Sequence, residues 1–263
     1  MKFIHLTDTH LVAHGERLHG IDACARLEAC AESITEAHAD AAFCVLTGDV
    51  ADAGDPRAYD AARTLLAHLP MPVHLIPGNH DDRDEMIAAF PDIPRDADGF
   101  VQQAFRHGDA HFVLLDTLEP SEGSGGAVCE RRAAWLEQRL AAAGDAPVYL
   151  FMHHPPFAIG IPALDRIALA DPAPFTRVVA AAGNVRHIFF GHAHRPISGQ
   201  WRGIGYSTLY GTNHQTRLDL VSSAPIAYTA EPPAYCVVLA DEEKVVVHTC
   251  YFLEDDRDIR QSR

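Results

Sequence analysis

The chain has 263 residues, of which 48% are hydrophobic and 22% charged, and its formal net charge at pH 7 is −15. This composition is typical of a globular protein with one large domain, residues 1–263, and it excludes a disordered or collagen-like chain and a bilayer-spanning apolar segment. The excess of 36 Asp and Glu over 21 Lys and Arg disfavours nucleic acid as a partner.

Short runs rich in β-branched and aromatic residues alternate with alanine-rich segments of helical length, and this alternation predicts an α/β fold. The predicted strands are residues 3–7, 42–47, 73–76, 111–115, 148–152 and 185–190. The predicted helices are residues 22–38, 56–69, 131–143 and 172–182. Asp55-Pro56 and Asp171-Pro172 mark two helix starts, since a capping carboxylate precedes a proline suited to the first turn.

From Trp201 onward the pattern changes to strand-like pieces at residues 204–207, 215–221, 235–239 and 245–252. We therefore divide the domain into a core of residues 1–200 and a β-rich portion of residues 201–263. We expect this portion to complete a second sheet and to offer an oligomer interface. The charged end, residues 254–263, is expected to fray or to dock on a partner.

The N-terminal segment and the cysteines indicate the compartment. Lys2, His5 and Asp8 interrupt the first apolar stretch, so it lacks the continuous hydrophobic segment of a secretory signal, and we expect a cytoplasmic protein without membrane contact. The six cysteines are scattered without a CxxC pair, which argues against a zinc-thiolate site and a disulfide framework.

Five of the predicted strands end at residue types that bind metals. Because ligands bind at the carboxyl ends of strands in an open α/β sheet, these endings are expected to converge. Asp8 with His10, and His192 with His194, are two residues apart, which places both side chains on one side of an extended backbone. A glycine precedes several of the ligands and permits a tight exit from the strand. The candidate ligands are Asp8, His10, Asp49, Asn79, His153, His192 and His194.

Only oxygen and imidazole donors occur in this set, which suits Mn, Fe, Co or Zn. Seven ligands are too many for one catalytic ion, whereas two ions about 3.5–4 Å apart with a bridging carboxylate would use them all. Asp49 is the predicted bridge.

The ordered motifs resemble those of the calcineurin-like metallophosphoesterases over residues 8–194. They are Asp8-x-His10, Gly48-Asp49-x-x-Asp52, Gly78-Asn79-His80-Asp81, His153 and Gly191-His192-x-His194. Asp8-Thr9-His10-Leu11, the compact length and the segment 207–215 are similar to the class III cyclic-nucleotide phosphodiesterases and their glycerophosphodiesterase relatives. The resemblance implies a four-layer αββα sandwich of two mixed sheets flanked by helices, and a homo-oligomer, dimeric or larger.

The resemblance also implies a role for each matching residue. Asp8, His10 and His194 would bind one ion, Asn79, His153 and His192 the other, and Asp49 both. His80, together with Asn79, would contact the substrate phosphate; Asp52 would orient His80, and His214 would lie at the substrate pocket. Asp81 departs from the glutamate that many members carry there, which argues against the protein-phosphatase branch.

The implied function is hydrolysis of a small phosphodiester, a 3′,5′-cyclic nucleotide or a glycerophosphodiester, by attack of a metal-bound hydroxide. His80 would protonate the leaving oxygen or hydrogen-bond to the phosphate. The acidic chain argues against the nuclease branch, which must hold a long polyanion. Two alternatives stay open: a phosphomonoesterase that uses the same metals, and a non-catalytic scaffold of the same fold, whose expected mark, a missing ligand, is absent from the sequence.

Other polar residues receive plainer interpretations. His154, beside His153, could be a spare ligand or part of the turn that enters Pro155-Pro156, and we favour the turn. Arg195 could bind phosphate or be solvated. Nine histidines are interpreted as ordinary core or surface residues: His5, His19, His38, His68, His74, His107, His111, His187 and His248.

Overall fold

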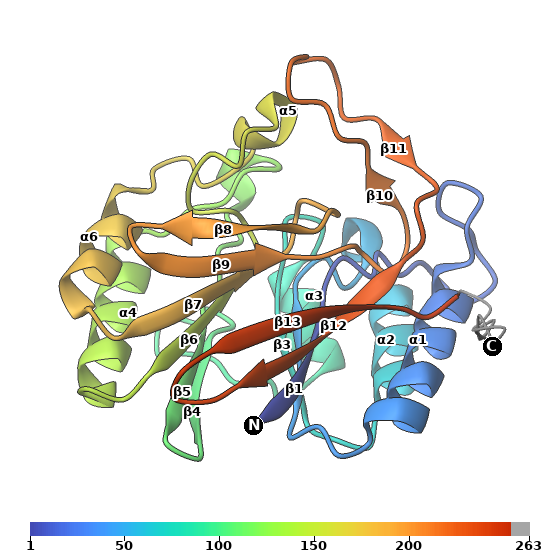
Figure 1. The fold of residues 1–263 in the computed structure, drawn as a ribbon. Coiled ribbons are helices and arrows are strands. Elements are labelled where there is room, and N and C mark those ends of the chain that lie inside the picture. Colours follow the sequence, from blue (N-terminus) through green and yellow to red (C-terminus); the bar gives the residue numbers. More distant parts are fainter. Residues whose placement is uncertain (254–263) are drawn as a thin grey trace, which may run out of the picture.

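The computed structural model of the protein describes residues 1–253, and the predicted tail at residues 254–263 lies outside them. Two mixed β-sheets lie face to face with helices on their outer sides, as Figure 1 shows. One sheet has the strand order β13-β12-β1-β2-β3 and the other β4-β5-β6-β7-β9-β8. The predicted αββα sandwich is confirmed.

The bounds of the elements are as follows. The helices are α1 (Ala23–His38), α2 (Pro56–Leu66), α3 (Arg83–Ala89), α4 (Glu130–Ala143), α5 (Pro162–Asp165) and α6 (Ala173–Ala182). The strands are β1 (Lys2–Leu6), β2 (Cys44–Thr47), β3 (Val73–Ile76), β4 (Gln103–His107), β5 (Ala110–Leu114), β6 (Val148–Met152), β7 (Val185–Phe190), β8 (Ile197–Trp201), β9 (Ile204–Thr208), β10 (Gln215–Thr216), β11 (Tyr228–Thr229), β12 (Ala234–Ala240) and β13 (Val245–Tyr251). Among the described residues, no helix combines the length and the apolar composition needed to span a membrane.

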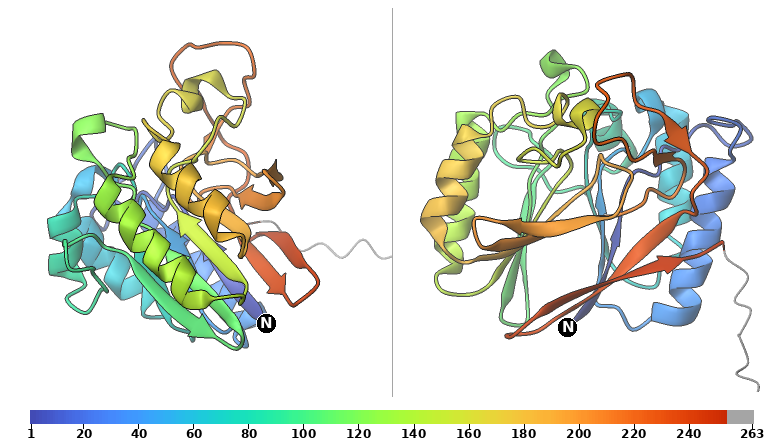
Figure 2. Two further views of the ribbon diagram at one scale, coloured as in Figure 1. Left: turned by 90° about the vertical axis from the view of Figure 1, so that its left-hand side faces the viewer. Right: turned by 45° about the horizontal axis from the view of Figure 1, so that its top comes forward.

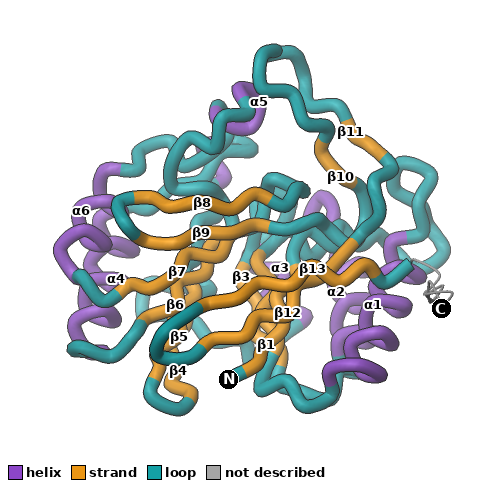
Figure 3. Tube along the Cα trace, in the orientation of Figure 1, coloured by secondary structure: helices purple, strands orange, loops and turns teal. Residues whose placement is uncertain are grey.

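Parallel pairing brings the ends of the central strands to one edge of each sheet. Leu46 of β2 pairs with Leu6 of β1 and with Leu75 of β3, so these three strands end at nearly the same height. Met152 of β6 pairs with Phe190 of β7 in the other sheet. The loops that follow these strands, drawn in teal in Figure 3, therefore start from neighbouring points.

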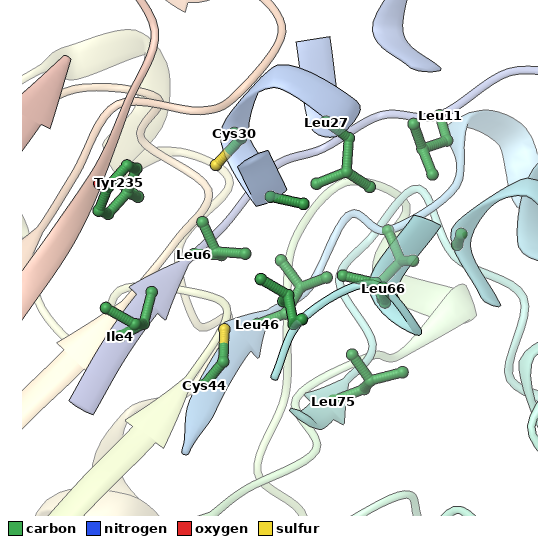
Figure 4. Packing of buried hydrophobic residues seen from close by; sticks show 14 of the residues in the cluster. Ile4, Leu6, Leu11, Leu27, Cys30, Cys44, Leu46, Leu66, Leu75 and Tyr235 are labelled. Carbon is green, nitrogen blue, oxygen red and sulfur yellow. The ribbon is translucent and has the colours of Figure 1, made fainter. Parts of the chain in front are cut away.

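Apolar side chains from helices and sheets form the layers of the core. Leu27 and Cys30 of α1 pack toward Leu6 and Leu46, as Figure 4 shows. Helices α4 and α6 lie side by side on the outer face of the six-stranded sheet (Figure 2). The predicted helix starts are also present, since the carboxylates of Asp55 and Asp171 accept hydrogen bonds from the backbone N–H groups of Arg57 and Ala173. In the described chain, the six cysteines are free and four of them are buried.

The C-terminal strands differ from the prediction that they complete one second sheet. Strands β8 and β9 extend the six-stranded sheet, whereas β12 and β13 extend the five-stranded one. Strand β12 lies between β1 and β13, and its two faces contribute to different cores, since Val237 lies in the core under α1 and Val238 in the core between the sheets. The predicted strand 215–221 is also too long, because only Gln215–Thr216 pair and Val221 is 90% exposed.

Two of the histidines interpreted as ordinary residues lie in the layer between the sheets. The Nε2 atom of His5 lies 2.9 Å from Thr47 Oγ1, and that of His187 lies 2.9 Å from Ser207 Oγ. Both rings contact the aromatic ring of Phe189. Burial lowers the pKa of His5 to about 3, with a further contribution from His187, and lowers that of His187 to about 4.

Replacing His187 with Gln should make stability less sensitive to acid. The pKa of His187 in the folded chain is about 4, below the usual 6.5. Between pH 4 and pH 6.5 the unfolded chain therefore binds a proton at this residue that the folded chain does not bind. Stability conferred by the neutral ring is therefore lost as the pH falls from 6.5, with a slope of up to about 1.4 kcal/mol per pH unit. Glutamine can retain the bond to Ser207 without titrating. Urea unfolding of both proteins from pH 7 to pH 5 measures the two slopes, and equal slopes would contradict the prediction.

Candidate metal centre

Five of the seven predicted ligands have left-handed backbone. The φ angles are 53° at Asp8, 41° at His10, 49° at Asp49, 65° at His192 and 45° at His194. The predicted extended geometry of the Asp8/His10 and His192/His194 pairs is therefore wrong, although each pair does converge. Left-handed backbone is uncommon for residues other than glycine, and such strain concentrates at functional sites where the surrounding structure enforces it.

Backbone hydrogen bonds between the first two loops hold this conformation. The N–H of Asp8 donates to the carbonyl of Gly48 at 3.1 Å, and the N–H of His10 donates to that of Asp49 at 2.8 Å. The loops after β1 and β2 thus continue the parallel ladder beyond the strands and keep their side chains in register.

The glycines that precede ligands serve mainly to leave space. A Cβ atom on Gly78 would lie 2.3 Å from Asp49 Oδ1, and one on Gly191 would lie 2.1 Å from Thr7 Oγ1. At Gly48 both reasons apply, since its φ is +88° and a Cβ would lie 2.5 Å from His153 Nδ1. The prediction of a tight backbone holds at Gly48, whereas close packing explains the other two.

A first group of donor atoms comes from three loops. One ligand atom from each of Asp8, His10, Asp49 and His194 lies within 4.8 Å of the others, and all four residues are buried. His10 Nε2 lies 3.0 Å from His194 Nε2 and 3.3 Å from Asp49 Oδ2. His194 Nε2 lies 3.5 Å from Asp8 Oδ1.

A second group lies on the other side of Asp49. Asn79 Oδ1 is 2.8 Å from His192 Nδ1 and 3.1 Å from His153 Nε2. His153 Nε2 is in turn 3.4 Å from Asp49 Oδ2, the same oxygen that faces His10. One carboxylate oxygen of Asp49 thus lies between the two groups, and all seven predicted ligands are brought together.

These donor atoms have the arrangement of metal ligands. Nitrogen and oxygen atoms bound to one ion at about 2.0–2.1 Å lie about 3 Å or slightly more from one another, as they do here. Asp8 Oδ2 is buried and has no hydrogen-bond partner among residues 1–253, which leaves it available to a cation. The residues therefore fit a centre that binds divalent or transition-metal ions.

Buried carboxylates favour positive charge in this site. Burial alone would lower the pKa of His10, but Asp49, Asp52 and Asp8 outweigh it and raise that pKa to about 10. Burial likewise opposes the effect of Asp49 on His153, whose pKa is raised to about 9. By contrast, burial lowers the pKa of His192 and of His194 to about 3, so these rings are neutral. His192 and His194 thus offer neutral nitrogens, whereas His10 and His153 hold protons that a bound cation would displace.

His80 and Asp52 lie at the rim of this centre. His80 Nδ1 is 2.9 Å from Asp52 Oδ1, and the side chain of His80 is 39% exposed. The same Asp52 oxygen lies 3.3 Å from His10 Nδ1, a contact that the sequence did not predict. The hydrogen bonds from His10 and His80 hold the pKa of Asp52 well below its usual value. Asp52 therefore orients both His10, which is inside the centre, and His80, which lies at its rim.

His214, expected at the substrate pocket, lies against the first group of donor atoms. Its ring centroid is 4.8 Å from that of His10 and 4.5 Å from that of His194, and its carbonyl accepts a hydrogen bond from His194 Nδ1 at 2.8 Å. The rings of His19 and Tyr228 pack on its other side at 4.8 Å and 4.4 Å. These two residues lie far apart in the sequence, and no motif indicated their position.

The structure also shows the surroundings of Arg195 and His154, whose roles the sequence left open. Arg195 forms an ion pair with Glu231 at 2.8 Å and donates to the carbonyl of Thr216, so it is neither solvated nor free to bind phosphate. His154 is fully buried, and one of its nitrogens lies within 4.8 Å of ligand atoms of His153 and His192. The interpretation of His154 as merely part of a turn is incomplete, because the turn places its ring beside the centre.

Comparison with known proteins identifies the family. Residues 1–196 match the family described as calcineurin-like phosphoesterase. The chain belongs to this family. A Rhodopseudomonas palustris protein named as a probable cyclic nucleotide phosphodiesterase is 44% identical to it over 97% of this chain and 94% of that relative. The glycerophosphodiester phosphodiesterase GpdQ of Enterobacter lignolyticus is 29% identical over 89% of this chain and 85% of GpdQ.

Solved structures support the same fold. A dimetal phosphatase from Danio rerio superposes with a TM-score of 0.73 at 17% identity, and the match covers 96% of each chain. The predicted resemblance to calcineurin-like phosphoesterases is thus confirmed, and with it the expectation of an enzyme that hydrolyses phosphoesters.

Asp81, where the sequence departs from the common glutamate, anchors the loops that carry Asp49 and Asn79. Its carboxylate accepts hydrogen bonds from the backbone N–H groups of Val50, Ala51 and Gly78 at 2.8–3.1 Å. It also accepts the Tyr59 hydroxyl at 2.9 Å.

Replacing Asp81 with Ala should lower the free energy of unfolding by about 3 kcal/mol or more, since each buried donor left without an acceptor costs about 1–3 kcal/mol. Tyr59→Phe removes one of these bonds together with the bond that the Tyr59 hydroxyl accepts from the Asp82 N–H at 2.9 Å, and it should cost about 1–2 kcal/mol. Urea unfolding of the three proteins measures the differences. Equal losses in the two variants would show that the backbone bonds to Asp81 contribute little.

Proposed function

We propose that this protein is a phosphodiesterase with a dinuclear metal centre that hydrolyses small phosphodiesters. The observation that carries the proposal is the position of Asp49, whose Oδ2 atom lies within 3.4 Å of imidazole nitrogens from both donor groups. The names of the relatives, which include cyclic nucleotide and glycerophosphodiester phosphodiesterases, support the substrate class.

Each donor group would hold one ion. Asp8, His10 and His194 would bind the first, Asn79, His153 and His192 the second, and Asp49 both. The mixture of imidazole and oxygen donors suits Mn, Fe, Co or Zn. When bound, such ions neutralise the charge of phosphate oxygens and lower the pKa of water to about 7.

His80 supplies the proton chemistry of this chain. Its Nδ1–H donates to Asp52, which fixes the ring and leaves Nε2 on the exposed side of the residue. A proton on Nε2 can hydrogen-bond to a phosphate oxygen, or it can be transferred to the departing alkoxide, which leaves the ring neutral with its proton on Nδ1. Such positioned acid catalysis typically contributes 10²- to 10⁴-fold in rate.

The cations near the centre favour a diester over a monoester. A phosphomonoester carries a second negative charge that calls for additional cationic groups. Arg83, beside Asn79 at the rim, is bound to Asp116 at 2.8 Å, and Arg195 is bound to Glu231. Because both guanidinium groups already face carboxylates, the extra charge of a monoester would gain little from them.

Two substitutions separate metal binding from proton transfer. Asp49→Ala should lose both ions and all activity, because it removes the ligand that the two groups share. His80→Ala should keep both ions while kcat falls about 10²- to 10⁴-fold. Elemental analysis after dialysis, together with steady-state kinetics, tests both variants. Unchanged activity in His80→Ala would remove His80 from the mechanism, and full metal content in Asp49→Ala would contradict the shared ligand.

Paired substrates test the reaction class. The metal-loaded protein should hydrolyse bis(p-nitrophenyl) phosphate with a higher kcat/KM than p-nitrophenyl phosphate. A preference for the monoester would favour the phosphomonoesterase alternative, and no hydrolysis of either would favour the non-catalytic scaffold. Cyclic AMP, cyclic GMP and glycerophosphodiesters, assayed on the same preparation, then identify the natural diester.

A further inference from the structure

His192 has one nitrogen in the donor group and one outside it. Nδ1 lies 2.8 Å from Asn79 Oδ1 and 3.3 Å from His153 Nε2, so it is the nitrogen that faces the second ion site. Nε2 is buried and has no hydrogen-bond partner within the described part of the chain. An imidazole that binds a metal through one nitrogen usually donates the other N–H to an acceptor, which fixes its tautomer and its orientation. A side chain that packs beside His192 Nε2 is therefore a candidate for this support.

His154 lies where such a support is needed. Its ring centroid is 4.9 Å from that of His192, and its own Nε2 is likewise buried and without a partner in residues 1–253. Its Nδ1 lies 2.8 Å from the hydroxyl of Thr117. If this Nδ1–H donates to Thr117, Nε2 carries a lone pair that can accept a hydrogen. The two Nε2 atoms form no hydrogen bond with each other in this structure, so joining them requires a small rotation of one of the two packed rings.

The loop that follows β5 holds His154 in place. Thr117 Oγ1 also lies 3.4 Å from the backbone nitrogen of His154, and a Cβ atom on Gly126 would lie 2.3 Å from His154 Nδ1. Residues on both sides of this loop, Leu118 and Gly126, form a β-bridge that closes it over the ring. The imidazole is therefore packed closely against this loop, although no proposed ligand role requires it.

We propose that His154 is a positioning residue for the second ion site: supported by Thr117, it orients the ring of His192 so that Nδ1 faces the ion. This inference rests on the dinuclear centre proposed above and adds a role for a residue that binds no ion itself. The competing possibility is that His154 only anchors the 117–126 loop, through Thr117 and the nearby backbone of Ser124.

Two amides of different length distinguish these possibilities. Glutamine at position 154 can place its amide near the former Nε2 and so reach His192, whereas asparagine can place its amide near the former Nδ1 and so reach Thr117. His154→Phe keeps a ring of similar size and removes both nitrogens. His68→Gln, at an exposed histidine after α2, is the matched control.

The readout is binding of Mn²⁺ to metal-free protein, followed by calorimetry and electron paramagnetic resonance, with thermal unfolding to confirm that each variant folds. In His154→Phe the weaker of two binding events should lose about 10- to 100-fold in affinity while the other is unchanged. His154→Gln should recover most of this loss and His154→Asn should not, and kcat should follow the affinity of the second ion.

Three results would overturn the inference. They are equal affinities in all variants, better recovery by Asn than by Gln, and a loss spread equally over both ions. Two-ion binding by the wild-type protein with unaltered binding in the variants would refute the role of His154 alone. A wild-type protein that binds no ion would refute the dinuclear centre as well.

Discussion

The buried carboxylate of Asp49 is the interaction on which the rest of the structure depends. It follows β2 of the five-stranded sheet, yet it contacts His153, which follows β6 of the other sheet. Burial opposes its ionisation, but His153 and His10 hold its pKa well below the usual value. A buried charge is costly unless it is paired, so the two sheets must bring their loops to the same place for Asp49 to be tolerated. The face-to-face packing of the sheets and the assembly of the centre are thus a single requirement.

The backbone around Asp49 shows how the fold meets this requirement. Left-handed residues in the loops after β1, β2 and β7 turn side chains toward a common point. Glycines leave the space that the approaching loops need, and Asp81 binds three backbone N–H groups of two loops at once. Strain that is individually unfavourable is held by hydrogen bonds from neighbouring loops. The precision of the site therefore comes from contacts between loops rather than from any one of them.

The sequence predicted best those strands whose side chains are mostly buried on both faces of a sheet. Strands β1, β2, β5, β6 and β7 are buried and β3 is half-buried, so their apolar runs are distinctive, and each of them except β5 ends at a ligand motif. Strands β4 and β8 lie at the two edges of the six-stranded sheet and are partly exposed, so they lack a continuous apolar run. The division of the C-terminal strands between the two sheets depends on packing partners distant in sequence, as β12 shows. Interactions such as those of His154 with Thr117, or Arg195 with Glu231, leave no local signal at all.

The histidines show why residue type alone could not assign roles. His187 is buried without a carboxylate nearby, and burial makes it a neutral core residue. His10 is equally buried, but three carboxylates raise its pKa to about 10. His192 is neutral like His187, yet its Nδ1 points at donor atoms from other loops. Burial selects the neutral form and nearby carboxylates select the charged form, but only the direction of the nitrogen determines whether a ring can bind an ion. That direction is set by the backbone and by the groups behind the ring, which are features of the folded chain.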